Sequence, residues 1–242
     1  MTDVWIPFAV KLPFVHSDGG SYVGGPPRGV LHTTQSWGYT PSVSNYYGHR
    51  NPPHVTIDRD GSIYQHFPAN RAARGLKHPR FRPHTNRRSA FQIEVVGFAQ
   101  NPDYPIEQVE ALQDVIGWVT DNLGVEREAP LPFIGSEGWG TDAPSRMKSQ
   151  DWKSFNAWCG HQHVPWNDHW DPGAIDPEEF ILTSWKEPGD PVRNRGDAVS
   201  VARFQGGERQ AVTVSSIEDE SSVVMFGRVL DILMQHDKRI GT

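Results

Sequence analysis

The sequence predicts an α/β fold, with a mixed central β-sheet flanked by helices and a C-terminal extension after the main domain. Two observations support this prediction. Short apolar or alternating runs, typical of strands, occur in the first hundred residues, and a long segment with helical periodicity follows them. Strands that are interleaved with helices indicate a layered α/β sandwich.

Four strand segments are expected. Residues 29–32 and 91–98 are short, mostly apolar runs. Residues 55–58 and 62–67 flank an Arg-Asp-Gly stretch, and an Asp-Gly pair between two such runs favours a β-hairpin. Residues 1–28 are rich in Gly and Pro and are expected to be irregular.

The long helix is predicted to begin after Pro105 and to end at Gly124. Proline suits the first turn of a helix and glycine suits the position just past its end. Between them, apolar residues recur every three or four positions: Ile106, Val109, Leu112, Ile116, Val119 and Leu123.

Two shorter helices are expected further along the chain. Residues 150–158 would place three aromatic side chains on one helical face: Trp152, Phe155 and Trp158. Asp176-Pro177-Glu178-Glu179 has the order of a helix start, with a capping Asp, a Pro in the first turn and acidic residues next to the helix N-terminus.

We expect residues 1–185 to form one domain and residues 186–242 to form the extension. The boundary is a Pro- and Gly-containing stretch typical of a linker. Within the extension, 198–204 and 210–216 alternate like a second hairpin, and 222–238 has a helical pattern. An appendage packed on the core is favoured over an interaction element, and the sequence assigns no ligand to it.

Composition excludes several classes of protein. The chain has 242 residues, of which 36% are hydrophobic and 21% charged, which is typical of a globular domain. A net charge of −6 and a pI near 6.0 argue against a nucleic-acid binder. Cys159 is the single cysteine, so an internal disulfide is impossible. No run approaches the roughly 18 apolar residues of a membrane span, and the N-terminus lacks the pattern of a secretory signal.

The most informative stretch is the loop from Gly160 to Gly173. It contains His161, His163, His169 and Asp171, all of which are possible metal ligands or proton-transfer groups. Another histidine, His32, follows an upstream apolar run. Two histidines and one carboxylate would leave one position of a tetrahedral zinc ion open for water, as in a hydrolytic site.

These motifs carry a family resemblance. Gly-His-x-x-Val at 160–164, Asp-Pro-Gly at 171–173 and Leu-His-Thr-Thr at 31–34 resemble the zinc N-acetylmuramoyl-L-alanine amidases. These enzymes belong to the superfamily of type 2 amidases and peptidoglycan recognition proteins, which includes many phage endolysins. The resemblance extends over about 29–180. It implies that Zn²⁺ is the cofactor and that its ligands are His32, His161 and Asp171.

The resemblance also implies roles for two further residues. Glu94, on an otherwise apolar strand, would be the general base, because burial raises the pKa of a carboxyl group towards a useful value. His169 would stabilise the oxyanion, and the main alternative makes it the third zinc ligand in place of Asp171. Some relatives carry a catalytic Tyr before the histidine at position 54. This chain has Pro53 there, which shifts the proton transfer to Glu94.

Substrate contacts are expected from two sources. The stretch 71–88 is basic, and we predict that Arg71 and Arg74 bind carboxylates of the stem peptide. A solvated basic loop is an equally good interpretation, and nucleic-acid binding is the least favoured one. Among the tryptophans, Trp37 and Trp170 are predicted to contact substrate because they lie close in sequence to the ligands.

The resemblance implies an enzyme that hydrolyses the amide between N-acetylmuramic acid and L-alanine in peptidoglycan. Two alternatives stay open: a recognition protein that binds muropeptides without cutting them, and a zinc peptidase that cuts within the stem peptide. Because no signal peptide is evident, we expect synthesis in the cytoplasm. The protein would then act on the cell wall after a phage-type release, or on muropeptides in the cytoplasm. The oligomeric state cannot be inferred from the sequence.

Overall fold

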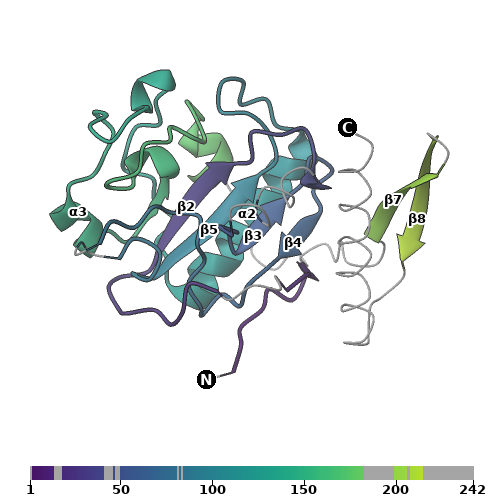
Figure 1. Cartoon of the computed structure of the whole chain (residues 1–242), viewed down its shortest axis with the longest axis horizontal. Helices are drawn as coiled ribbons and strands as arrows, with labels where there is room; N and C mark the ends of the chain where they lie inside the picture. The colour runs from purple at the N-terminus through teal and green to yellow at the C-terminus, as the bar shows by residue number, and fades with distance from the viewer. Residues whose placement is uncertain are drawn as a thin grey trace.

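The computed structural model describes most of the predicted domain and part of the extension: residues 2–13, 18–40, 46, 50–80, 82 and 84–182, together with the backbone of 199–205 and 208–214. The main sheet has six strands in the spatial order β1 (Val10–Lys11), β4 (Ile63–Gln65), β3 (Val55–Ile57), β5 (Ala90–Val95), β2 (Arg28–Thr33) and β6 (Trp158–Gly160). The sheet is mixed, because β3 and β4 are antiparallel whereas the other neighbouring pairs are parallel (Figure 1).

The predicted strands form where the apolar runs placed them. β2 and β5 occupy the two runs expected to be strands, and β3 and β4 form the predicted hairpin. At the turn, Gly61 has a φ of 81°, which a residue with a side chain rarely adopts. The Asp-Gly pair therefore supplies the backbone freedom on which the hairpin prediction rested.

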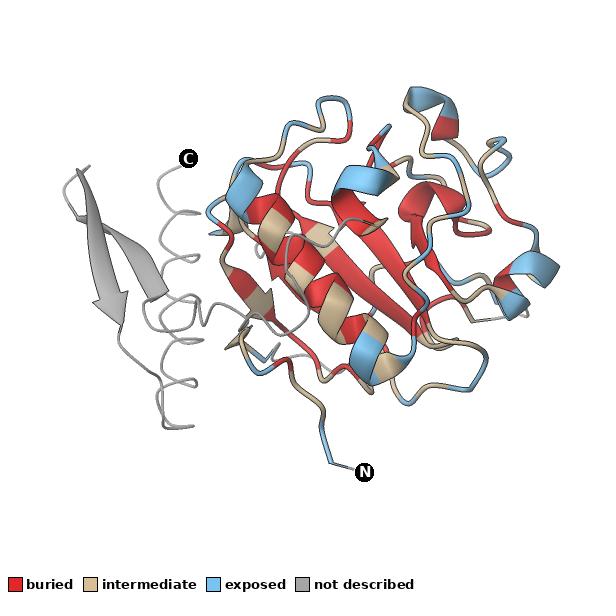
Figure 2. Cartoon of the chain, turned by 180° about the vertical axis from the view of Figure 1, so that it is seen from behind, coloured by how far each residue is buried: buried red, intermediate tan, exposed pale blue. Residues whose placement is uncertain are grey.

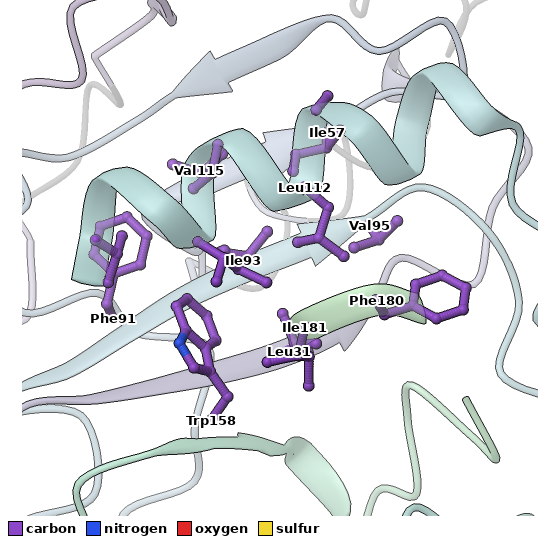
Figure 3. Packing of buried hydrophobic residues seen from close by; sticks show 14 of the residues in the cluster. Leu31, Ile57, Phe91, Ile93, Val95, Leu112, Val115, Trp158, Phe180 and Ile181 are labelled. Carbon is purple, nitrogen blue, oxygen red and sulfur yellow. The ribbon is translucent and has the colours of Figure 1, made fainter. Parts of the chain in front are cut away.

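The long helix α2 (Ile106–Leu123) covers one face of the sheet. It follows Pro105 and ends at Gly124, whose φ is 72° and whose N–H donates to the Thr120 carbonyl. The helix lies behind the strands in Figure 1 and in front of them in Figure 2. Its buried side chains, including Leu112 and Val115, pack against alternate residues of the strands, as Figure 3 shows.

The other face of the sheet is covered by loops and by the short helix α3 (Ser149–Ser154). This helix corrects the expectation that a helix extends to residue 158. The backbone becomes extended at Phe155, and Trp158 begins edge strand β6, paired with Gly29 of β2. Because the sheet edge offers backbone hydrogen bonds, pairing overrides the helical spacing of the aromatic residues. Trp152 and Trp158 consequently belong to different buried clusters.

Two other local expectations have different outcomes. The helix start at Asp176 is confirmed, since its carboxylate accepts a hydrogen bond from Glu178 N (3.0 Å) at the start of the π-helical turn η3 (Glu178–Leu182).

The expectation of an irregular segment before residue 28 is wrong in part, because β1 lies within it. Val10 and Lys11 form the edge strand and pair with β4, and this two-residue pairing is too short to leave a strand pattern in the sequence.

In the extension, β7 (Val199–Gln205) and β8 (Glu208–Val214) form an antiparallel two-stranded sheet, so the second hairpin is confirmed. The helix predicted over 222–238 and the boundary at 185/186 lie outside the described residues. Within the described part of the chain, no helix combines the length and the apolar composition needed to cross a bilayer.

The contact between β2 and β6 yields a stability prediction. A methyl group added at Gly29 would lie 2.1 Å from the buried Trp158 ring. We expect Gly29→Ala to lower the free energy of unfolding by roughly 1–3 kcal/mol, as overpacking does. The control is Gly117→Ala in α2, where the nearest atom is 3.8 Å away and the free energy should rise by about 0.5–1 kcal/mol. Urea unfolding of both variants measures the difference, and equal stability of the two would refute this packing.

Candidate metal centre and active site

The site is built on a row of residues that crosses neighbouring strands at one level of the sheet. Glu94 of β5 is the register partner of His32 on one side and of Thr56 on the other. Register partners point to the same face of a sheet, here the face opposite α2. On the far side of β2, strand β6 pairs Gly160 with the residue before His32, so His161 continues the row. The folding of four strands therefore brings together residues that are up to 129 positions apart.

Three side chains converge at the end of this row. The Nδ1 atoms of His32 and His161 are 3.1 Å apart. The Asp171 carboxylate lies 3.5 Å from Nδ1 of His32 and 3.2 Å from Nδ1 of His161. All three residues are buried, and one ligand atom from each lies within 4.8 Å of the others. Among the described residues, this group has the composition and spacing needed to hold a metal ion.

The electrostatics of the group suit a cation. Burial, together with the neighbouring His161, lowers the pKa of His32 to about 4, which keeps this imidazole neutral. Burial alone would raise the pKa of Asp171, but His161, His169 and His32 hold it well below its ordinary value. Neutral imidazoles and an ionised carboxylate are the forms that bind metals. A divalent cation at the convergence would accept lone pairs from all three residues.

Asn167 orients one of these imidazoles. Its Oδ1 lies 2.8 Å from Nε2 of His161, and its Nδ2 donates to the carbonyls of Lys77 and Pro165. Because these carbonyls fix the amide orientation, Oδ1 must be the atom that faces His161. The imidazole then carries its proton on Nε2 and directs the lone pair of Nδ1 into the site. Such hydrogen bonds to the non-ligating nitrogen are typical of metal-bound histidines.

His169 lies at the mouth of the site and outside the group of three. Its ring is stacked on that of His161, with centroids 4.9 Å apart, and its Nδ1 is 3.6 Å from Asp171. The side chain is 53% exposed. The hydrogen bond to Asp171 raises the pKa of His169, which favours the protonated form. This position suits a cationic hydrogen-bond donor next to the metal site.

Glu94 is positioned as a proton acceptor. Its Oε2 atom is buried and has no hydrogen-bond partner among the described residues. Burial, assisted by the negative charge of Asp171, raises its pKa well above the ordinary value. A carboxyl group with a raised pKa accepts a proton more readily than an ordinary carboxylate, which suits a general base.

Sequence reasoning missed two tyrosines around Glu94. The hydroxyl of Tyr46 lies 3.2 Å from Thr56, and burial and the Glu94 charge raise its pKa well above the ordinary value. The Tyr104 hydroxyl is buried and unpartnered within the described residues, and burial with the charges of Asp171 and Glu94 raises its pKa. No sequence motif indicated either residue, because only the tertiary fold brings them near Glu94.

The residues predicted to contact substrate occupy different environments. Trp37 is 72% exposed on the loop after β2, where its ring lies 4.6 Å from Phe98. Trp170 is half-buried within the loop 160–173, termed the ligand loop because it contains the candidate ligands His161 and Asp171. Arg71 forms an ion pair with Asp18 at 2.7 Å, so an intramolecular carboxylate already engages its guanidinium. Arg74 is exposed, and its backbone N–H donates to Pro52.

The remaining histidines of the motifs have structural positions. His163 accepts a hydrogen bond from Gly160 N through Nδ1, and its Nε2 lies 3.0 Å from the Pro132 carbonyl. His54 is buried and accepts from Gln92 N. Burial lowers the pKa of both histidines to about 4. They hold loops and strands together while remaining neutral. Cys159 is a buried thiol whose pKa burial raises to about 12.

Comparison with known proteins finds one family match that contains these residues. The family model described as N-acetylmuramoyl-L-alanine amidase matches residues 24–174, which include all three members of the metal-binding group and Glu94. No curated protein matches the chain.

Several solved structures are similar in fold. The amidase LysC of Clostridium intestinale is 18% identical, with a TM-score of 0.46, covering 72% of this chain and 95% of LysC. A selenomethionine derivative of AmpD is 17% identical, with a TM-score of 0.48 and coverage of 74% and 96%. The recognition protein PGRP-SA of Apis mellifera is 17% identical, with a TM-score of 0.43 and coverage of 68% and 89%.

Since these structural likenesses are distant, the assignment comes from the family match, which covers more than half of the sequence. The matched segment contains the row of residues on β3, β5 and β2 and the loop that follows β6. The chain belongs to the N-acetylmuramoyl-L-alanine amidase family.

Proposed function

We propose that this protein is a zinc-dependent N-acetylmuramoyl-L-alanine amidase that acts on bacterial peptidoglycan as a phage endolysin or a related cell-wall lytic enzyme. The observation that carries the proposal is the convergence of His32, His161 and Asp171 beside Glu94, whose Oε2 atom is buried. A binding protein needs neither a three-ligand metal group nor a carboxyl group with a raised pKa next to it. This pairing therefore favours catalysis over recognition alone.

The ligand set suits Zn²⁺. Two imidazole nitrogens and one carboxylate oxygen are typical of catalytic zinc sites, in which a fourth position stays open for water. When bound, the ion would supply a water of lowered pKa and a Lewis acid for the scissile carbonyl. Asp171 offers one oxygen to each imidazole, and Thr33 N lies 3.3 Å from Oδ2, which orients the carboxylate.

The chain's own groups divide the proton transfer and charge stabilisation between them. Glu94 takes the proton from the attacking water and returns it to the departing amine, since amide cleavage requires a protonated leaving group. His169, whose pKa is raised by its contact with Asp171, donates a hydrogen bond to the oxygen on which negative charge develops. Trp37 and the basic stretch containing Arg71 and Arg74 are the proposed contacts for the rest of the substrate.

The metal assignment predicts a graded series. Wild-type protein should co-purify with about one zinc per chain, and His32→Ala, His161→Ala and Asp171→Ala should each lose it. His169→Ala should keep its zinc. Asn167→Leu removes the partner of His161 Nε2 together with the hydrogen bonds of Asn167 to Lys77 and Pro165, and its zinc affinity should fall roughly 10- to 100-fold. Metal analysis and chelator competition measure both effects. Zinc lost from His169→Ala but kept in Asp171→Ala would make His169 the ligand.

The role of Glu94 is tested by Glu94→Gln. The variant keeps the shape of the side chain, so folding and zinc content should be unchanged, whereas the rate should fall by roughly 10² to 10⁴. Steady-state hydrolysis of purified peptidoglycan measures the rate. Tyr46→Phe serves as the comparison, because Tyr46 reaches the same row through Thr56. If Tyr46→Phe showed the large loss and Glu94→Gln did not, the tyrosine would be the proton carrier.

Product analysis identifies the bond. A muramoyl-alanine amidase releases peptides whose new amino terminus is L-alanine and creates no new reducing ends in the glycan. A stem-peptide cutter would expose the amine of a later residue, and a recognition protein would sediment with cell walls without releasing anything. Labelling the new amines after digestion, followed by mass analysis, separates these outcomes. A main product with any other amino terminus would rule out the amidase.

A further inference from the structure

Trp139 is an exposed aromatic residue beside the active site that the sequence analysis did not assign to substrate binding. Its side chain is 62% exposed, and within the described part of the chain only three other large hydrophobic residues are comparably exposed: Val23, Trp37 and Ile106. It directly follows the 3-10 turn η1 (Ser136–Gly138). One exposed hydrophobic residue needs no explanation by itself, so its surroundings decide its role.

Its indole ring continues a stack that begins at the metal-binding group. His169 is stacked on His161 with ring centroids 4.9 Å apart, and Trp139 is stacked on His169 at 6.0 Å with an interplanar angle of 24°. The three rings therefore lead outward from a proposed zinc ligand to the protein surface. A group bound against Trp139 would be close to the bond that is cleaved.

Arg146 holds the loop of Trp139 rigidly against the ligand loop. Its guanidinium donates hydrogen bonds to carbonyls on both sides of the tryptophan, at Gly138 (3.1 Å) and Gly140 (3.0 Å). The same guanidinium donates to the carbonyls of His161 (2.6 Å) and His169.

A second link joins the two loops, because Gly140 N donates to the Asp168 carbonyl (2.8 Å). The loop is also tightly packed, since a Cβ at Gly138 would lie 3.2 Å from Trp170. A side chain on such a loop is positioned before any ligand arrives, which lowers the entropic cost of binding.

The charges around Trp139 indicate which part of the substrate it meets. Residues 128–145 contain no Lys or Arg, while Glu137 and Asp142 are exposed on either side of the tryptophan. The nearest cationic groups, Arg146 and His169, are already engaged, the first by backbone carbonyls and the second by Asp171. By contrast, Arg59 lies over Trp37 at 5.8 Å, on a different loop of the site. A neutral, ring-shaped ligand group fits the Trp139 side, and an anionic peptide fits the Trp37 side.

We propose that Trp139 is the binding face for a pyranose ring of the glycan strand, on the muramoyl side of the scissile amide. This inference rests on the proposed function. A flat, rigid indole matches the face of C–H groups that a pyranose ring presents, and stacking needs no charge on either partner. Arg146 acts as a positioning residue, because its hydrogen bonds hold the backbone on both sides of Trp139 against the backbone of His169.

The experiment compares two substrates that share the scissile amide. One is a disaccharide-peptide, and the other is a D-lactoyl-peptide that keeps the amide but lacks the sugar ring. Trp139→Ala should lower kcat/KM for the disaccharide-peptide roughly 10- to 100-fold, mainly through KM, and leave the D-lactoyl-peptide unchanged. Trp139→Phe should retain most of the activity. Ile106→Ala, an exposed apolar residue of α2 on the other face of the sheet, is the control and should change neither.

An equal loss on both substrates would overturn the inference, because it would mean that Trp139 acts only by supporting His169. Zinc content of each variant checks that the metal site is intact. A binding titration with the free disaccharide, using the zinc-loaded Glu94→Gln protein with and without Trp139→Ala, is independent of turnover. Loss of binding in the double variant supports the inference and equal binding overturns it. If the wild type cleaved neither substrate, the proposed function would fail while this titration still decided the role of Trp139.

Discussion

The parallel pairing of β2 with β5 is the constraint on which the site depends. Its register sets His32 opposite Glu94, and the adjoining pair of β2 with β6 delivers His161 to the same level. A shift of one residue in either pair would turn one of these side chains to the α2 face, because side chains alternate along a strand. Leu31 and Ile93, which pack under α2, hold the register, so the hydrophobic core and the site depend on each other.

Burial of ionisable groups is the second constraint. His32, His161, Asp171 and a carboxyl oxygen of Glu94 are all removed from water within one small region. Such burial costs several kcal/mol per charge when it is not compensated. The protein offsets part of this cost with the neutral imidazole of His32 and with Asn167, which lies 2.8 Å from the outer nitrogen of His161. One lone-pair atom from each of His32, His161 and Asp171 lies within 4.8 Å of the others, and a cation bound between them would accept all three lone pairs.

Local patterns predicted those elements whose signals are local. The ends of α2 are set by Pro105 and Gly124, and the first hairpin by its Asp-Gly turn, because each of these depends on backbone preferences of neighbouring residues. The same reasoning failed for Trp158. Trp158 has helical spacing from Trp152, but its backbone pairs with Gly29 of β2 and forms an edge strand instead. Short edge strands such as β1 and β6 form because a neighbouring strand offers backbone hydrogen bonds, and they leave little hydrophobic pattern in the sequence.

The sequence by itself determined the mixed α/β fold, the family, and the identity of the possible ligands, because motifs and periodicity reside in neighbouring residues. Tertiary structure decided how these residues are used. It grouped Asp171 with His32 and His161, left His169 at the mouth of the site, and brought Tyr46 and Tyr104 near Glu94. It also joined the Trp139 loop to the ligand loop through Arg146. Distances between residues more than a hundred positions apart depend on strand register and packing, which no local pattern encodes.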